Sequence, residues 1–163
     1  MRKLPPINQN GFTLIETMVA ISIITIGLMS TLSLVITSTA LVTSIHDRLI
    51  GANLAAEGLE IARNIRDNNW LQSQPWNNGL ADGDYQAAYN SAALNAYGDA
   101  FLLLDAATGV YDYAPASGQT IFKRRITVTN LSAYEMRVVS VVTWQRRNAT
   151  YTSSAEEHLF DWK

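Results

Sequence analysis

The sequence predicts an α+β protein in which a long N-terminal α-helix packs on a small C-terminal antiparallel β-sheet. Two observations predict the helix. Residues 12 to about 67 contain no Pro and only three Gly, and their apolar spacing stays compatible with a helix throughout. A third observation predicts the sheet, because apolar and polar residues alternate along the last part of the chain, as they do in strands with one buried face.

The composition is that of one small domain joined to an apolar helix. The chain has 163 residues, a net charge of -2 and no Cys, which excludes disulfides and thiolate metal sites. Its two His, His46 and His158, lie far apart in the sequence, and neither a nucleophile motif nor a Gly-rich phosphate loop is present. We therefore expect no enzymatic activity, no cofactor and no metal.

The predicted helix begins with an apolar segment that carries a single charge. Glu16 is the only ionisable side chain from Phe12 to Ile45, and about 20 apolar residues suffice for a helix to cross a bilayer. A lone carboxylate in such a segment is costly, so Glu16 is a candidate functional group. Arg2 and Lys3 precede the segment, and because positive flanks stay in the cytoplasm, the chain beyond about residue 43 is expected to lie outside.

The run GFTLIETMVAISIITIGL, from Gly11 to Leu28, resembles the cleavage and methylation signature of type IV prepilins and type II secretion pseudopilins. The resemblance implies that prepilin peptidase cuts between Gly11 and Phe12, that Phe12 is then N-methylated, and that the segment after the cut is retained. A conventional secretory signal has its cleavage site after the apolar run, whereas Gly11 comes before it. Gly11 also suits a protease subsite, because the missing Cβ lets an enzyme approach the backbone closely.

Cleavage would expose an amine on Phe12 at membrane depth, where an unpaired charge is costly. Glu16 can neutralise this amine, and the resemblance to pilins favours pairing between neighbouring subunits during assembly. A contact within one chain stays open as well, since Phe12 and Glu16 are four residues apart and would share one helix face.

The resemblance and the composition together divide the chain into four parts. The expected parts are a cleaved leader (1–11), a transmembrane or filament-core half of the helix (12–42), an amphipathic half (43–69) and an extracytoplasmic sheet domain (70–163) whose first part, 70–100, is a connecting loop. The segments 64–70 and 156–162 are similar to parts of minor pilins of the pilus-modification type.

The amphipathic half of the helix has two apolar faces, which implies two packing partners. Both faces could be buried within the domain, or one could meet the sheet and the other the helices of neighbouring subunits. One face holds Ile45, Leu49, Ala52, Ala56 and Leu59, and the other holds Ile50, Leu54, Ile61 and Ile65.

The sheet domain is expected to contain a hairpin and three further strands. The hairpin is predicted from segments 101–105 and 110–113, which flank a turn at 106–109. A weak helical turn is expected before it, at 91–94. The last strand is expected from Ala149 to Phe160, after a turn at Arg147 and Asn148. In the first of the two strands before it, Phe122, Ile126 and Val128 are expected to share the buried face, and in the second Tyr134, Met136, Val138, Val142 and Trp144.

Other candidate sites carry weaker signals. Asp82-Gly83-Asp84 has too few acids for the 6 to 8 oxygen ligands of calcium and is read as a solvated turn. Asn130 and Asn148 begin glycosylation sequons, which arise readily by chance. Between Asp67 and Gln119 the charged residues are all acidic, whereas the following strands are basic, which indicates acidic loops packing on basic strands of another subunit rather than nucleic-acid binding. The basic residues are Lys123, Arg124, Arg125, Arg137, Arg146 and Arg147.

The favoured interpretation is a structural subunit, a minor pilin or pseudopilin, of a type IV pilus or a type II secretion-like filament. It would be inserted in the cytoplasmic membrane with its N-terminus inside, and then placed in a cell-surface or periplasmic filament. Its expected partners are prepilin peptidase, other pilin subunits, the membrane and the inner-membrane assembly platform. Two alternatives stay open: a tip-located adhesin or DNA-binding pilin, and a single-pass anchored domain that never assembles.

Overall fold

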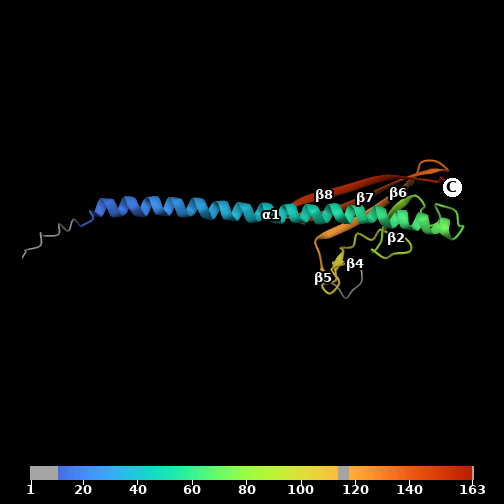
Figure 1. The fold of residues 1–163 in the computed structure, drawn as a ribbon, viewed down its shortest axis with the longest axis horizontal. Helices are drawn as coiled ribbons and strands as arrows, with labels where there is room; N and C mark the ends of the chain where they lie inside the picture. Colours follow the sequence, from blue (N-terminus) through green and yellow to red (C-terminus); the bar gives the residue numbers. More distant parts are fainter. Residues whose placement is uncertain (1–10, 114–117, 163) are drawn as a thin grey trace, which may run out of the picture. The chain divides into compact units, whose positions relative to one another are not determined.

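The computed structural model describes residues 11–113 and 118–162 and contains one long helix followed by strands (Figure 1). Helix α1 runs from Leu14 to Leu71, over 58 residues. The chain forms two units, residues 1–45 and residues 46–163, and each is described by itself below. The long helix and the antiparallel sheet confirm the predicted α+β class.

The N-terminal unit is helical from Leu14 onward, two residues later than expected, because Thr13 caps the helix. The Thr13 carbonyl accepts the backbone N–H of Thr17 at 3.2 Å, and its Oγ1 accepts the N–H of Glu16 at 3.3 Å. This stretch of α1 is the one segment among the described residues that is long and apolar enough to cross a membrane.

The second unit is a sheet domain covered by the second half of α1. Its main sheet has five strands in the order β2-β1-β6-β7-β8, with antiparallel pairing throughout. The strands are β1 (Gly83–Gln86), β2 (Asn95–Ala96), β6 (Phe122–Asn130), β7 (Glu135–Arg146) and β8 (Ala149–Phe160). The last three were predicted, and β8 has the predicted bounds. The hairpin between β7 and β8 turns at Arg147 and Asn148, which have φ of 48° and 64°, as a two-residue type I′ turn requires.

A second sheet of three short strands stands beside the main one, in the order β4-β3-β5. It consists of β3 (Leu103–Leu104), β4 (Tyr111–Asp112) and β5 (Gly118–Gln119). The predicted hairpin is confirmed, since Leu104 pairs with Tyr111. The helical turn expected at 91–94 was wrong, because that segment is irregular and leads into β2, and the 70–100 region is not only a loop.

The core of the domain lies between α1 and the main sheet and forms two apolar clusters. One joins Ile61 and Ile65 of α1 to Ile126 and Met136 of the sheet, and the other joins Leu54 of α1 to neighbouring aromatic residues. The predicted inward faces of β6 and β7 are confirmed with one exception. Tyr134 is exposed, because β7 begins one residue later, at Glu135. The aromatic residues of the second cluster include Phe122, Trp144, Tyr111 and Tyr151.

The two apolar faces of the amphipathic half have different surroundings. Leu54, Ile61 and Ile65 are buried against the sheet. On the other face Leu49 is 58% exposed, and Ala52 and Ala56 are exposed too. The first face therefore already has its partner within the domain. The second face is exposed along most of its length among the described residues, and Leu59 at its end is partly buried against the core.

Candidate functional site

The expected cleavage site lies just ahead of the helix. Gly11 and Phe12 are outside α1 and exposed, and Thr13 stops the helical hydrogen bonding before it reaches them. A Cβ placed on Gly11 would meet nothing within 4 Å. Because the carbonyls and N–H groups of this peptide are not engaged in a helix, an enzyme can bind them directly. The leader residues before Gly11, including Arg2 and Lys3, lie outside the described residues.

Glu16 lies in the first turn of α1, and its side chain is exposed. Within the described parts of the chain no basic side chain forms an ion pair with it. Phe12 precedes the helix, so the shared helix face expected for Phe12 and Glu16 is not formed in this structure. Among residues 11–113 and 118–162, the Glu16 carboxylate thus has no cation as a partner.

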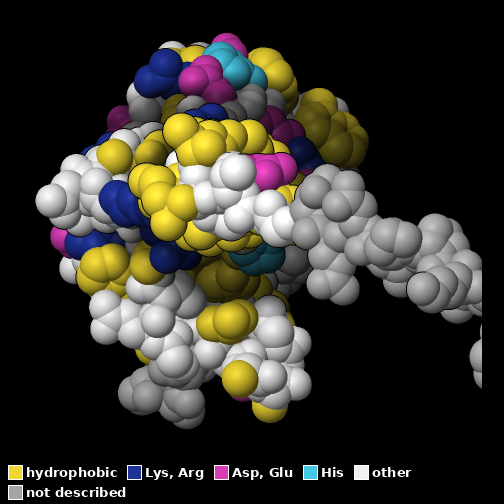
Figure 2. Space-filling view, turned by 90° about the vertical axis from the view of Figure 1, so that its left-hand side faces the viewer, with side chains coloured by type: hydrophobic (Ala, Val, Ile, Leu, Met, Phe, Trp, Pro, Cys, Tyr) yellow, Lys and Arg dark blue, Asp and Glu magenta, His cyan; other side chains and the backbone are white. Residues whose placement is uncertain are grey.

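The helix beyond Glu16 presents an apolar surface despite its Ser and Thr residues. Most of their hydroxyl groups donate to backbone carbonyls of the preceding turn, as Ser22 does to Met18 at 2.8 Å and Thr25 to Ile21 at 2.7 Å. Because these hydroxyl groups already have hydrogen-bond partners, placing them in an apolar environment costs little free energy. Figure 2, which views the molecule from the left of Figure 1, shows hydrophobic side chains gathered around this end of the helix.

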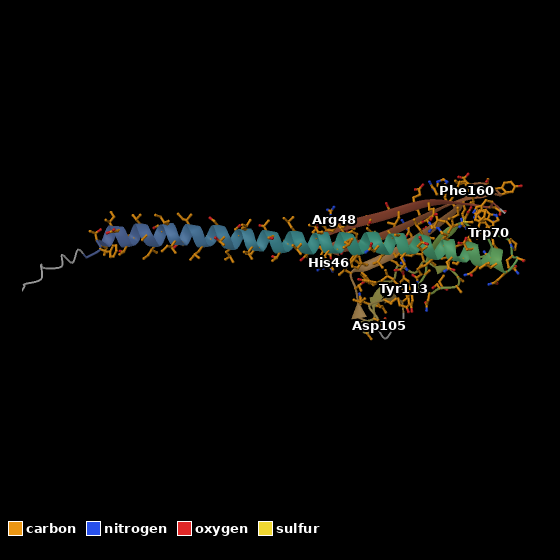
Figure 3. All side chains as sticks on the ribbon, in the orientation of Figure 1. His46, Arg48, Trp70, Asp105, Tyr113 and Phe160 are labelled. Atoms are coloured by element: carbon orange, nitrogen blue, oxygen red, sulfur yellow. The ribbon has the colours of Figure 1, made fainter. Side chains whose placement is uncertain are left out.

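Arg124, one of the predicted basic residues, is fully buried instead of lying on a surface. Its Nη1 donates to the Leu54 carbonyl at 3.1 Å and to Glu57 at 3.0 Å, and its Nη2 donates to the Ala87 carbonyl. The Tyr113 hydroxyl, near the small sheet in Figure 3, donates to the Arg124 carbonyl at 3.4 Å. Burial raises the pKa of Tyr113. Arg124 therefore ties β6 to α1.

Other basic residues pair with acids of the same chain. Lys123 Nζ lies 2.6 Å from Asp99, Arg125 lies 3.8 Å from Asp84, and Arg146 lies 2.7 Å from Asp47 of α1. Much of the acidic and basic asymmetry is thus compensated within one subunit. Trp144, expected on the buried face of its strand, is buried against α1 and is not available to stack on a nucleic-acid base.

The Asp82-Gly83-Asp84 segment is not a free turn, because Gly83 begins β1. The Asp82 carboxylate accepts hydrogen bonds from the backbone N–H of Asn130 at 2.6 Å and from the Asn130 side-chain Nδ2 at 2.8 Å. These hydrogen bonds lower the pKa of Asp82. Asn130, the first residue of one sequon, also donates to the Leu80 carbonyl at 3.1 Å. Among the residues with described placement, no group of three or more His, Cys, Asp or Glu is arranged to hold a metal ion.

Comparison with known proteins gives one match. Residues 7–32 fit the family described as the prokaryotic N-terminal methylation motif. No curated protein and no solved structure matches the chain. The matched residues include Gly11, Phe12 and Glu16, and the motif is the signature of pilin-type structural proteins. The chain thus carries the N-terminal signature of type IV pilins and pseudopilins.

Proposed function

We propose that this protein is a minor pilin or pseudopilin, a structural subunit of a type IV pilus or a type II secretion-like filament. Prepilin peptidase removes residues 1–11 on the cytoplasmic side, and Phe12 is methylated on its new amine. The cytoplasmic membrane and the assembly platform within it then hold the subunit until other pilins pack around α1. The observation that carries the proposal is the methylation motif at the start of an apolar helix.

Glu16 acts in assembly by pairing with the Phe12 amine of a neighbouring subunit. Its carboxylate has no cation within the described chain, and the cost of burying a lone charge is relieved only when a partner arrives. The pairing sets the register between subunits, because a shifted neighbour would leave both charges uncompensated.

The exposed apolar face of the amphipathic half supports assembly as well. Leu49, Ala52 and Ala56 lie on the side of α1 that the sheet does not cover. Small residues let helices approach closely, so this face is suited to the helix of a neighbouring subunit. The sheet domain, residues 70–163, remains outside the membrane.

The test compares wild type with Glu16→Gln in a host that makes the filament. Intact and N-terminal peptide masses should show a chain that begins at methylated Phe12 in both, but only when prepilin peptidase is present. Sheared filaments should contain wild-type subunits and at least about tenfold fewer Glu16→Gln subunits, because a neutral amide leaves the amine unpaired. Glu60→Gln, an exposed change on the same helix, serves as the matched control and should be incorporated normally.

Two results would contradict the proposal. Retention of residues 1–11 in a competent host would mean that the chain is an anchored domain outside the pilin pathway. Equal incorporation of Glu16→Gln and wild type would mean that processing occurs but that Glu16 has no part in assembly.

A further inference from the structure

A cleft of about 500 Å³ lies on the side of the main sheet that faces away from α1. The buried residues Phe122 and Trp144 point from β6 and β7 toward the helix. Their neighbours Lys123, Thr143 and Gln145 point the other way, because side chains alternate along a strand. These outward residues and Thr150 of β8 form the floor of the cleft, and the segments around residues 99–101 and 119–121 form its wall.

The floor and wall carry uncharged polar side chains that have no partner within the described chain. Thr143 and Thr150 offer hydroxyl groups, and Gln119 and Gln145 offer amide groups, and none of these side chains makes a hydrogen bond to another described residue. A hydroxyl or amide group can both donate and accept. The cleft thus presents both donors and acceptors, which suits a ligand that has many hydroxyl groups.

The charges in the cleft cancel each other. Asp99 and Lys123 are its charged residues, and the Lys123 Nζ lies 2.6 Å from an Asp99 carboxylate oxygen. Asp99 also accepts the Tyr97 hydroxyl at 2.8 Å. The contacts with Lys123 and Tyr97 lower the pKa of Asp99, so the carboxylate stays ionised and paired. Because each of these charges already has a partner of opposite sign, neither is left over for a charged ligand, which favours a neutral one.

An aromatic ring completes the wall. Phe101 is 39% exposed, and the Lys123 ammonium lies 4.6 Å from the centre of its ring, which fixes the ring beside the floor. The exposed part of the ring can pack against C–H groups of a ligand, while the hydroxyl and amide groups of the cleft can bind its polar groups. Sugar rings combine these two surfaces in one small molecule.

We propose that this cleft binds a neutral saccharide, with Thr143, Gln145, Gln119 and Thr150 binding its hydroxyl groups and Phe101 packing on its C–H face. Ligand sites of this kind are concave and place a few convergent polar groups around an apolar surface. The site goes beyond a structural role, because it gives each subunit that displays it a means of attachment to a glycan surface.

The experiment measures saccharide binding by the full chain in micelles of a detergent that has no sugar head group. The probes are maltotetraose, cellotetraose and the tetramer of N-acetylglucosamine, with sialyllactose and a heparin tetrasaccharide as charged comparators. Binding is detected by saturation-transfer NMR and quantified by calorimetry. Thr143→Val and Gln145→Ala remove one binding group each. Thr152→Val is the matched control, because Thr152 pairs with Thr143 across β7 and β8 but does not line the cleft.

We expect at least one neutral probe to bind wild type and Thr152→Val alike, and to bind Thr143→Val and Gln145→Ala at least about fivefold more weakly. Absence of binding by every neutral probe at about 10 mM would overturn the proposal. Equal affinity of all four proteins would place binding elsewhere, and a preference for the charged probes would refute the neutral class. The measurement uses isolated subunits, so its outcome is independent of filament assembly.

Discussion

At the scale of single residues, the buried guanidinium of Arg124 is the most consequential contact in the sheet domain. The group is fully buried and depends on the Glu57 carboxylate and on two backbone carbonyls for compensation. Removing one partner of a buried pair costs more than the pair contributes, since the remaining charge stays uncompensated.

We therefore expect Glu57→Ala to lower the free energy of unfolding by about 1–3 kcal/mol, less than for a fully buried pair because Glu57 is itself partly exposed. Glu60→Ala, one turn away, removes a carboxylate whose contact with Arg63 is exposed, and should cost less than about 0.5 kcal/mol. Urea unfolding of both variants, followed by Trp fluorescence, measures the difference. Equal losses would show that Arg124 does not depend on Glu57.

Asp82 should make stability sensitive to acid. Its hydrogen bonds from Asn130 hold the pKa of Asp82 below the ordinary 3.8. The folded carboxyl group therefore binds a proton less readily than the unfolded one, so its stabilisation is present above pH 3.8 and is lost as the pH falls through the folded pKa. Carboxyl-carbon NMR should find the titration midpoint of Asp82 below 3.8 in wild type, and part of the way back toward 3.8 in Asn130→Ala, which keeps only the backbone donor. An unchanged midpoint would contradict this account.

Residue-level expectations from the sequence succeeded where the local pattern was sufficient. The run from Gly11 to Leu28 was sufficient to identify the methylation motif that residues 7–32 match, because its signal is contained in consecutive residues. Arg124 was instead assigned to a basic surface, although the alternation of β6 places it on the same face as Phe122 and Ile126. That alternation was the available signal. The partner that compensates the buried charge could not be read from the local pattern, because Glu57 is distant in the sequence.

At the scale of elements, the approach of α1 to β7 depends on a glycine. A Cβ on Gly58 would lie 2.2 Å from Ser140 Oγ and 2.9 Å from Ser140 Cβ, so the helix and the strand would have to separate. Ala is otherwise the better helix former by about 0.8–1.0 kcal/mol. The two effects have opposite signs, which makes the outcome informative.

We expect Gly58→Ala to destabilise the domain by about 1–3 kcal/mol, as overpacking does. Gly27→Ala, where a Cβ would meet nothing within 4 Å, is the matched control and should not destabilise. In a double-mutant cycle Ser140→Gly should recover part of the loss, because it removes both clashing atoms. A stabilising effect of Gly58→Ala would show that α1 and β7 are packed more loosely than this structure has them.

Strand β8 forms an outer edge of the main sheet, and Pro substitutions at two neighbouring positions of β8 should have different effects on stability. The type I′ turn makes Arg146 and Ala149 a hydrogen-bonded pair, so with the observed register the backbone groups of Ser153 face β7 and those of Ser154 face solvent. Ser153→Pro should cost at least about 3 kcal/mol, whereas Ser154→Pro loses no ladder bond and should cost about 1 kcal/mol. Thermal unfolding by circular dichroism distinguishes them, and a larger loss for Ser154→Pro would mean a shifted register.

The long elements of the fold could be predicted and the short ones could not. Strands β6, β7 and β8 have 9, 12 and 12 residues, long enough for alternation to be visible. Strands β1 and β2 have 4 and 2 residues in a region rich in Asn, Gly and Tyr, and they form only because β6 offers an edge to pair with. Pairing between distant segments leaves no local pattern in the sequence.

At the scale of the whole molecule, the two units differ in how their charged side chains are paired. The sheet domain compensates many of its charges internally, through Asp47 and Arg146, Arg63 and Glu157, and Asp99 and Lys123. Glu16, in the other unit, has no such partner among the described residues.

The position of Glu16 in the first turn of α1 has an electrostatic consequence. Aligned peptide dipoles place about half a positive charge at the start of a helix, so the carboxylate leaves the tip of the uncut chain with a net charge of about minus one half. Cleavage after Gly11 would add the charge of the new amine and turn the sum to about plus one half. Processing would thus reverse the polarity of the helix tip, so that a tip that attracts cations before the cut attracts a carboxylate after it.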